Sequence, residues 1–194
     1  MKHAVIVAHP NPESFTLSVA RTYCEAVTAK GHEPLLRDLY AMDFDPRLKA
    51  DEIAGSKAFA PAEDVKAERE RLKDVDVFAF IYPFWINAPP AILKGYIDRI
   101  FGMGFAYAPG KEGNKPQLAG RKMISFTSSG APTEWVHRTG AWDAERTLFD
   151  QHIAALSGLS ILDHVHFGGI VPGIRADVVE RHFASVRATV AKYF

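Results

Sequence analysis

The amino-acid sequence predicts an α/β protein built on a doubly wound, five-stranded parallel sheet with helices on both faces. Short apolar runs rich in β-branched and aromatic residues, which are typical of strands buried on both faces, recur along the chain. Between them lie longer segments whose apolar residues repeat at helical spacing. Strands that alternate with helices favour a parallel sheet between two helical layers. A length of 194 residues favours one domain, spanning 1–194.

The first part of the chain supplies two strands and two helices. The run AVIVA is continuous and apolar, the turn-forming segment HPNPES follows it, and Ser14 is a good N-cap for the next helix. Gly31 suits the end of that helix. The expected elements are a strand at 4–8, a helix from 15 to about 31, a weaker strand at 32–37, a loop with at most one helical turn at 38–55 and a charged helix at 63–73.

The stretch at 75–101 is the centre of the prediction. Its first seven residues form an apolar run that reads as a buried strand. This strand ends at Pro83, which has no N–H to donate to a sheet ladder. Pro89 and Pro90 suit the first turn of a helix, and an apolar stripe then continues to Phe101. The residues at 84–88 therefore form a loop at the carboxyl end of the strand.

The remaining elements complete the sheet. They are a long irregular segment at 102–120, a strand at 122–126, a helix at 143–156, a strand at 160–167 and a last helix at 177–193. Five strands at this spacing fit the flavodoxin-like order 2-1-3-4-5. In that order a flavin binds at the switch between the first and third strands, outside their carboxyl ends.

Composition and residue spacing exclude several classes of function and of site. A formal net charge of zero argues against a nucleic-acid binder that neutralises phosphates. The single cysteine, Cys24, excludes an internal disulfide. The histidines show no metal-binding spacing, so we expect no metal site, and His164 and His166 are expected to pack or face the surface. No Ser/His/Asp arrangement is predicted. Without a secretory signal or an apolar span, we expect a cytoplasmic protein with no membrane insertion.

Three strand ends carry the candidate site. The loop after the first strand leads into a helix N-terminus, where backbone amides and the helix dipole attract phosphate; His9, Ser14 and Thr16 add polar groups. The loop containing Phe84, Trp85 and Asn87 suits a flat ring, and the turn at 127–130 offers hydroxyls and amides to the edge of such a ring. In the proposed strand order these loops converge. Neither a Walker loop nor a GxGxxG motif is present.

The chain resembles the NAD(P)H:quinone oxidoreductases, a flavodoxin-like family that also includes modulator-of-drug-activity and potassium-efflux ancillary proteins. The resemblance covers most of the chain. It rests on AHPNPESFTLSVA after the first strand, DLYAMDFDP, PPAILKGYIDRIF followed by GFAY, and the turn SFTSSG.

The resemblance implies a flavin-dependent oxidoreductase that passes a hydride from NAD(P)H to quinones, and also to nitro or azo compounds. The flavin is expected to be FAD, with FMN as the alternative. The implied cofactor-binding residues are His9, Ser14, Phe15, Thr16, Leu17, Pro83, Phe84, Trp85, Ile86, Asn87, Thr127, Ser128, Ser129 and Gly130. The implied substrate pocket comprises Phe105, Tyr107, Trp135 and His137. A homodimer is expected, in which Tyr107 reaches the partner's site.

The chain departs from the family pattern in two places. Trp85 and Ile86 stand where the family usually has Gln and Trp. Family members also carry a Tyr and a His as a proton relay; Trp135 stands at the Tyr position, and His137 is near but out of register with the His. The alternative function is a regulatory, ancillary flavoprotein subunit of a potassium efflux system, in which the same domain is a binding module.

Overall fold

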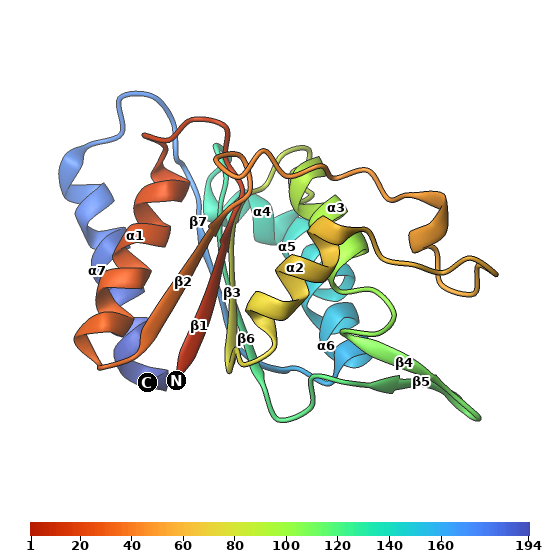
Figure 1. The fold of residues 1–194 in the computed structure, drawn as a ribbon. Helices are drawn as coiled ribbons and strands as arrows, with labels where there is room; N and C mark the ends of the chain where they lie inside the picture. Colours follow the sequence, from red (N-terminus) through yellow and green to blue (C-terminus); the bar gives the residue numbers. More distant parts are fainter.

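A parallel sheet with the strand order β2-β1-β3-β6-β7 forms the centre of the computed structural model, which describes residues 1–194 (Figure 1). Its strands are β1 (Lys2–Val7), β2 (Glu33–Asp38), β3 (Val77–Pro83), β6 (Lys122–Ser128) and β7 (Ser160–Phe167). Every neighbouring pair is parallel. The predicted order 2-1-3-4-5 is confirmed, with β6 and β7 as the fourth and fifth strands.

Helices cover both faces of the sheet, as Figure 1 shows. One face carries α1 (Phe15–Ala29) and α7 (Ala176–Tyr193), which contact one another. The other face carries α2 (Glu63–Leu72), α3 (Ala91–Ile100), α4 (Thr133–Arg138), α5 (Ala141–Glu145) and α6 (His152–Ser157). This double cover explains why every residue of β3 is buried, whereas the edge strand β2 has only half-buried and exposed residues.

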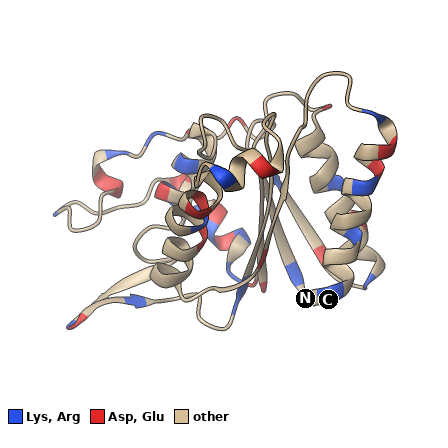
Figure 2. Ribbon diagram, turned by 180° about the vertical axis from the view of Figure 1, so that it is seen from behind, with Lys and Arg blue, Asp and Glu red and all other residues tan.

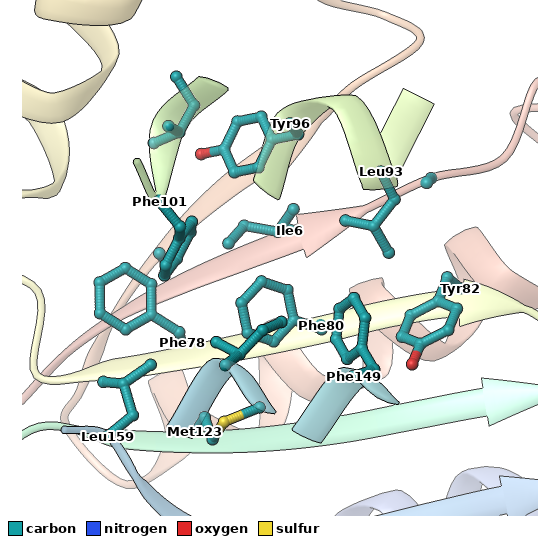
Figure 3. Close-up of a cluster of buried hydrophobic side chains, with 14 of the residues drawn as sticks. Ile6, Phe78, Phe80, Tyr82, Leu93, Tyr96, Phe101, Met123, Phe149 and Leu159 are labelled. Atoms are coloured by element: carbon teal, nitrogen blue, oxygen red, sulfur yellow. The ribbon is translucent and has the colours of Figure 1, made fainter. Parts of the chain in front are cut away.

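The two faces of the sheet bury different side chains, because successive residues of a strand point in opposite directions. The large aromatic residues Phe78, Phe80 and Tyr82 face the layer of α3. Figure 3 shows Phe78 and Phe80 near Phe101, and Tyr82 beside Phe149. The smaller residues that alternate with them in β3 face α1 and α7. Two apolar cores result, and they hold the strands between them.

The segment at 102–120 differs from its prediction. It contains an antiparallel hairpin, β4 (Tyr107–Gly110) and β5 (Gly113–Pro116), which extends away from the sheet in Figure 1. The prediction that this whole segment is irregular is therefore wrong. The sequence did not reveal the hairpin because β5 is fully exposed. An exposed strand has no alternation of buried and polar residues by which the sequence could reveal it.

The helix predicted at 143–156 is three joined segments. It begins at Ala141 as α5, passes through a π-helical turn, η2 (Arg146–Gln151), and ends as α6. The short helix α4 before it was not predicted. The π-helical turn continues the helix without a gap, so the segment has the length and composition of a single helix. The helical turn expected within 38–55 is present as η1 (Ala50–Glu52).

A buried ion cluster fixes the long segment before α2 onto α3. The guanidinium of Arg99, which is inaccessible to solvent, donates two hydrogen bonds to Glu52 at 2.8 and 2.9 Å and two to Asp64 at 2.7 and 3.0 Å. It also donates to the carbonyl of Asp45 at 2.7 Å. Gly95 lets this segment approach α3 closely, since a Cβ at that position would lie 2.2 Å from the Pro46 carbonyl oxygen.

Most other charges lie on the outer helices and loops, as Figure 2 shows. The Lys94–Asp98 pair on α3 is one of them: both side chains are largely exposed. Exposed pairs contribute little to stability, because water screens them and two flexible side chains must be ordered. The buried cluster around Arg99 is therefore expected to contribute more to the stability of the fold than this exposed pair.

We predict that Arg99→Leu lowers the free energy of unfolding by about 3–5 kcal/mol, because the change leaves the buried carboxylate of Glu52 without its partner. Urea unfolding of the purified variant measures this loss. As the matched control, Lys94→Leu removes the cationic partner of an exposed pair on the same helix and should change stability by less than about 1 kcal/mol. Equal losses in the two variants would contradict the structural role of the cluster.

Candidate active site

A cavity of about 150 Å³ lies at the carboxyl ends of β1, β3 and β6. These are the three strand ends that the sequence singled out. The residues that line the cavity are His9, Phe15, Thr16, Pro83, Phe84, Trp85, Ser128, Ser129, Gly130 and Ile170. All but Ile170 were among the predicted cofactor residues. The structure thus brings together one part from each of the three loops.

The N-terminus of α1 forms one end of this cavity. Ser14 caps the helix: its hydroxyl accepts the amide of Leu17 at 3.2 Å, and its carbonyl accepts the amide of Ser18. The amides of Phe15 and Thr16 have no partner within the helix, as is usual for a first turn, and both residues line the cavity. A free helix N-terminus favours an anion such as phosphate. The side chain of Leu17 lies in the core, so this residue contributes only backbone.

His9 supplies a donor to the same end. Its Nδ1 accepts the Asn11 amide at 3.0 Å, so the neutral ring carries its proton on Nε2. Burial lowers the pKa of this imidazole. His9 therefore serves as a neutral hydrogen-bond donor near pH 7 and not as a cation.

Two aromatic side chains, Phe84 and Trp85, form the wall of the cavity. The amide of Phe84 donates to the Ser128 carbonyl at 2.7 Å, which ties the loop after β3 to the turn after β6. Trp85 is 42% exposed, and the centre of its ring lies 5.5 Å from that of the His9 ring. An apolar wall opposite hydroxyls and amides suits a flat heteroaromatic ring with a polar edge.

The turn beyond Trp85 places two predicted residues outside the cavity. Trp85 and Ala88 exchange both backbone hydrogen bonds, and the two residues between them, Ile86 and Asn87, have positive φ angles of 54° and 55°. Ile86 is 99% exposed. A β-branched residue is strained in this left-handed conformation, so the turn stores strain beside the site.

Thr127 is also outside the cavity, because its side chain points into the protein. Its hydroxyl lies 2.8 Å from Nε2 of His164, and Nδ1 of the same ring lies 2.5 Å from a carboxylate oxygen of Asp150. The other oxygen of Asp150 accepts the hydroxyl of Ser125 at 2.8 Å. All four side chains are buried.

A second set of bonds continues from Thr127 to the cavity. The Thr127 hydroxyl lies 3.0 Å from Nδ1 of His166, and Nε2 of that ring lies 2.9 Å from the hydroxyl of Ser129. Ser129 in turn donates to the Ala131 carbonyl at 2.9 Å. The histidines of β7 pack on the aromatic rings of Phe84 and Trp142, in line with the expected packing role, and they also join these hydrogen bonds, which was not expected. The partners come from β6, η2 and β7, and no spacing in the sequence signals that they meet.

The four predicted substrate residues do not line this cavity within one chain. Phe105 packs on Phe78 and Phe101, and Tyr107 lines a separate cavity of about 270 Å³ beside α3 and α6. His137 lies on α4 with its ring 5.2 Å from that of Trp142, and Trp135 on the same helix is 39% exposed. The larger cavity is mainly apolar and lies away from the strand ends, so the smaller one is the better candidate site.

The structure contains no group of three or more histidine, cysteine, aspartate or glutamate residues positioned to hold a metal ion. It also contains no helix with the length and apolar character needed to span a membrane.

Comparison with known proteins places the chain in a family. A family profile described as a flavodoxin-like fold matches residues 1–192. The chain belongs to this flavodoxin-like family. The protein is 33% identical over 132 residues to an uncharacterised NAD(P)H oxidoreductase of Haemophilus influenzae, an alignment that covers 68% of this chain and 65% of that protein. The chain spans about half to two thirds of the length of the curated relatives that head the comparison.

Solved structures agree on the fold of this flavodoxin-like protein. An NAD(P)H:quinone oxidoreductase from Methanothermobacter marburgensis superposes with a TM-score of 0.86 at 29% identity, covering 98% of this chain and 95% of that one. An FMN-dependent NADH-azoreductase from Bacillus anthracis, solved with FMN, superposes with a TM-score of 0.77 at 16% identity over 98% of each chain. The second likeness shows the fold alone.

We predict that Ile86→Asn raises the free energy of unfolding of the flavodoxin-like domain by about 1 kcal/mol, because asparagine tolerates the left-handed backbone that strains isoleucine. The exposed Ile86 side chain has no packing to lose. Ile53→Asn is the control: Ile53 is also exposed but has an ordinary φ of −72°, and its replacement should change stability by less than about 0.5 kcal/mol. An Ile86→Asn variant no more stable than the parent in chemical unfolding would contradict the strain.

Proposed function

We propose that this protein is a flavin-dependent NAD(P)H:quinone oxidoreductase. The observation that carries the proposal is the single cavity in which a free helix N-terminus, an aromatic wall and a hydroxyl-bearing turn converge. These are the three parts that a flavin requires: an anion site, a surface for a ring and donors for its edge. The names of the relatives from Haemophilus and Methanothermobacter support the same chemistry.

Each part of the chain then has a role. The amides of Phe15 and Thr16 and the Nε2–H of His9 hold the phosphate. Phe84 and Trp85 orient the ring and exclude water from one side of it, while Ser128 to Gly130 donate to its polar edge. A bound flavin supplies the chemistry of accepting a hydride from NAD(P)H and returning it to a quinone-type acceptor. The protein contributes position and electrostatics.

Either FAD or FMN fits the phosphate end of the cavity. The sequence resemblance at DLYAMDFDP favours FAD, and the azoreductase from Bacillus anthracis holds FMN. Mass spectrometry of the flavin released from the purified protein distinguishes the two.

We propose further that the enzyme acts as a homodimer. A cavity of about 150 Å³ is smaller than the roughly 300–1,000 Å³ of pockets that enclose a ligand, so part of the ring must project from one chain. Beside α3, Ile97, Phe101 and Leu148 line the larger apolar cavity together with Tyr107, and Leu148 is 74% exposed. Exposed apolar surface of this kind marks an interface. A two-fold partner would cover it and bring Tyr107 to the other subunit's flavin.

We predict that Ser14→Asp removes the flavin. Aspartate preserves the N-cap, so the helix still forms, but it places a negative charge against the phosphate. The measurement is the ratio of flavin absorbance to protein absorbance after purification, which should fall at least tenfold. Ser160→Asp adds the same charge at the exposed start of β7, at the opposite end of the sheet, and should leave the ratio unchanged. A fully loaded Ser14→Asp protein would mean that the phosphate site lies elsewhere.

We predict that two inactive variants restore activity when they are mixed. The parents are a Tyr107→Ala protein without turnover and the Ser14→Asp protein without flavin. After reversible dissociation, one site of each hybrid dimer combines an intact flavin loop with an intact Tyr107 from the other chain, so up to half of the hybrid sites are active. A monomeric mass in solution, or hybrids that remain inactive, would refute the shared site.

A further inference from the structure

The direction of the hydrogen bonds between Asp150 and Ser129 follows from the bond that Ser129 donates to the Ala131 carbonyl. Ser129 has one hydroxyl proton and donates it to the Ala131 carbonyl, so it must accept from Nε2–H of His166. Burial, followed by the nearby charges of His164 and His137, lowers the pKa of His166 to about 4. The ring is therefore neutral at pH 7, and its Nδ1 accepts the hydroxyl proton of Thr127.

The same count of protons applies to the hydrogen bonds between Thr127 and Asp150, which lie farther from the cavity. Since the only hydroxyl proton of Thr127 is committed to His166, Thr127 accepts from Nε2–H of His164. Ser125 donates to one oxygen of Asp150. A further proton must then lie between the second oxygen of Asp150 and Nδ1 of His164, which are 2.5 Å apart. The buried Asp150–His164 pair thus holds one proton that the hydrogen bonds connect to the cavity.

We propose that Asp150, His164, Thr127, His166 and Ser129 form a proton relay that delivers this stored proton to the cavity. The inference rests on the proposed function, because a hydride that enters the cavity brings negative charge, which a proton neutralises. Ser129 turns from the Ala131 carbonyl and gives its proton to a basic atom in the cavity.

Three further transfers restore the hydroxyls. Ser129 takes the Nε2 proton of His166, His166 takes the hydroxyl proton of Thr127 at Nδ1, and Thr127 takes the Nε2 proton of His164. The cavity gains one proton and the relay loses one. What remains is the Asp150 carboxylate, bonded to Nδ1–H of a neutral His164 and to Ser125. No electrons move within the relay, and uptake of one proton from water refills it.

Aromatic rings insulate the relay. The Phe84 ring stacks on His166 at 4.8 Å and 29°, and the Trp142 ring lies 4.7 Å from His164. The side chains of Asp150 and His164 are each only 1% exposed. Ser129 lines the cavity and is thus the relay's contact with it. Asp150 also lies in the π-helical turn η2. Such turns are rare in proteins, and those that occur are often found at functional sites.

Other ionisable groups surround the relay without interrupting it. Glu145 of α5 accepts the hydroxyl of Tyr82 at 2.7 Å, and burial raises its pKa. Asp163 of β7 accepts the backbone amide of His164. Arg146 of η2 lies over the Trp142 ring, and His137 of α4 packs on that ring from its own helix. None of these groups is hydrogen bonded to a side-chain atom of the relay, so the path from Asp150 to Ser129 has no branch.

The test uses two variants that interrupt the relay differently. Asp150→Asn keeps an oxygen for Ser125 and supplies an amide donor for His164, so the hydrogen bonds persist but the stored proton is gone. Thr127→Val keeps the Asp150–His164 pair but removes the hydroxyl between the two rings. The control is Thr189→Val, since that buried hydroxyl bonds only to Ser185 of its own helix α7.

The first measurement needs no flavin. Nitrogen-15 NMR of histidine-labelled apoprotein should show His166 neutral and protonated at Nε2 from pH 6 to 8, and a proton at or shared by Nδ1 of His164. Asp150→Asn should remove the proton from Nδ1 of His164, whereas Thr127→Val should retain it. A His166 ring protonated at Nδ1, or an Nδ1 of His164 that Asp150→Asn leaves unchanged, would overturn the relay.

The second measurement is single-turnover reduction of the flavin-loaded protein. The rate constant of the parent and of Thr189→Val should change less than twofold between pH 6 and 8, because the proton comes from within. In both relay variants the proton must come from water, so the rate should fall about tenfold per pH unit. Relay variants that bind flavin fully and keep a flat pH profile would overturn the proposal. Failure of the parent to bind flavin would instead overturn the proposed function, and the NMR result would then decide the relay alone.

Discussion

The parallel pairing of β1, β3 and β6 is the constraint on which the rest of this structure depends. Val7 is in register with Ile81, and Ile81 with Phe126, so the three strands end at nearly the same level. Their loops consequently start side by side. The amide of Phe84 donating to Ser128 continues the ladder beyond the sheet and fixes the aromatic wall against the hydroxyl-bearing turn. The candidate site exists because three segments distant in sequence are held in register.

Two of the buried polar groups beside the larger apolar core differ in kind. Around Arg99, every charge is compensated by fixed hydrogen bonds to carboxylates, an arrangement that joins the segment before α2 to α3 and has no mobile proton. The Asp150–His164 pair holds a proton that can move, and its hydrogen bonds lead to a cavity. The Arg99 cluster is therefore structural, because its hydrogen bonds do not lead to the cavity. The Asp150–His164 pair can act at the cavity, because its hydrogen bonds lead there.

The strained turn at Ile86 follows Trp85, and the relay ends at Ser129; both Trp85 and Ser129 line the same cavity. The turn after Trp85 keeps an exposed isoleucine in a left-handed conformation, which costs stability and contributes no packing. Phe84, one residue before Trp85, stacks on His166 and closes the relay from solvent. The loop after β3 therefore has two roles: its aromatic side chains form the wall of the cavity, and one of them shields the relay beneath it.

The sequence by itself determined the sheet, its order and most of the cavity. Buried strands are continuous apolar runs, and helix caps and prolines mark the ends of elements, so local composition was sufficient to place His9, Phe84 and Ser129 at one edge. The β4–β5 hairpin was missed because an exposed strand has no alternation of buried and polar residues, and the π-helical turn because it continues the helix without a gap. Only the tertiary structure showed that Thr127, Asp150 and His164 meet, because hydrogen bonds between side chains of different elements depend on packing distance and not on spacing along the chain.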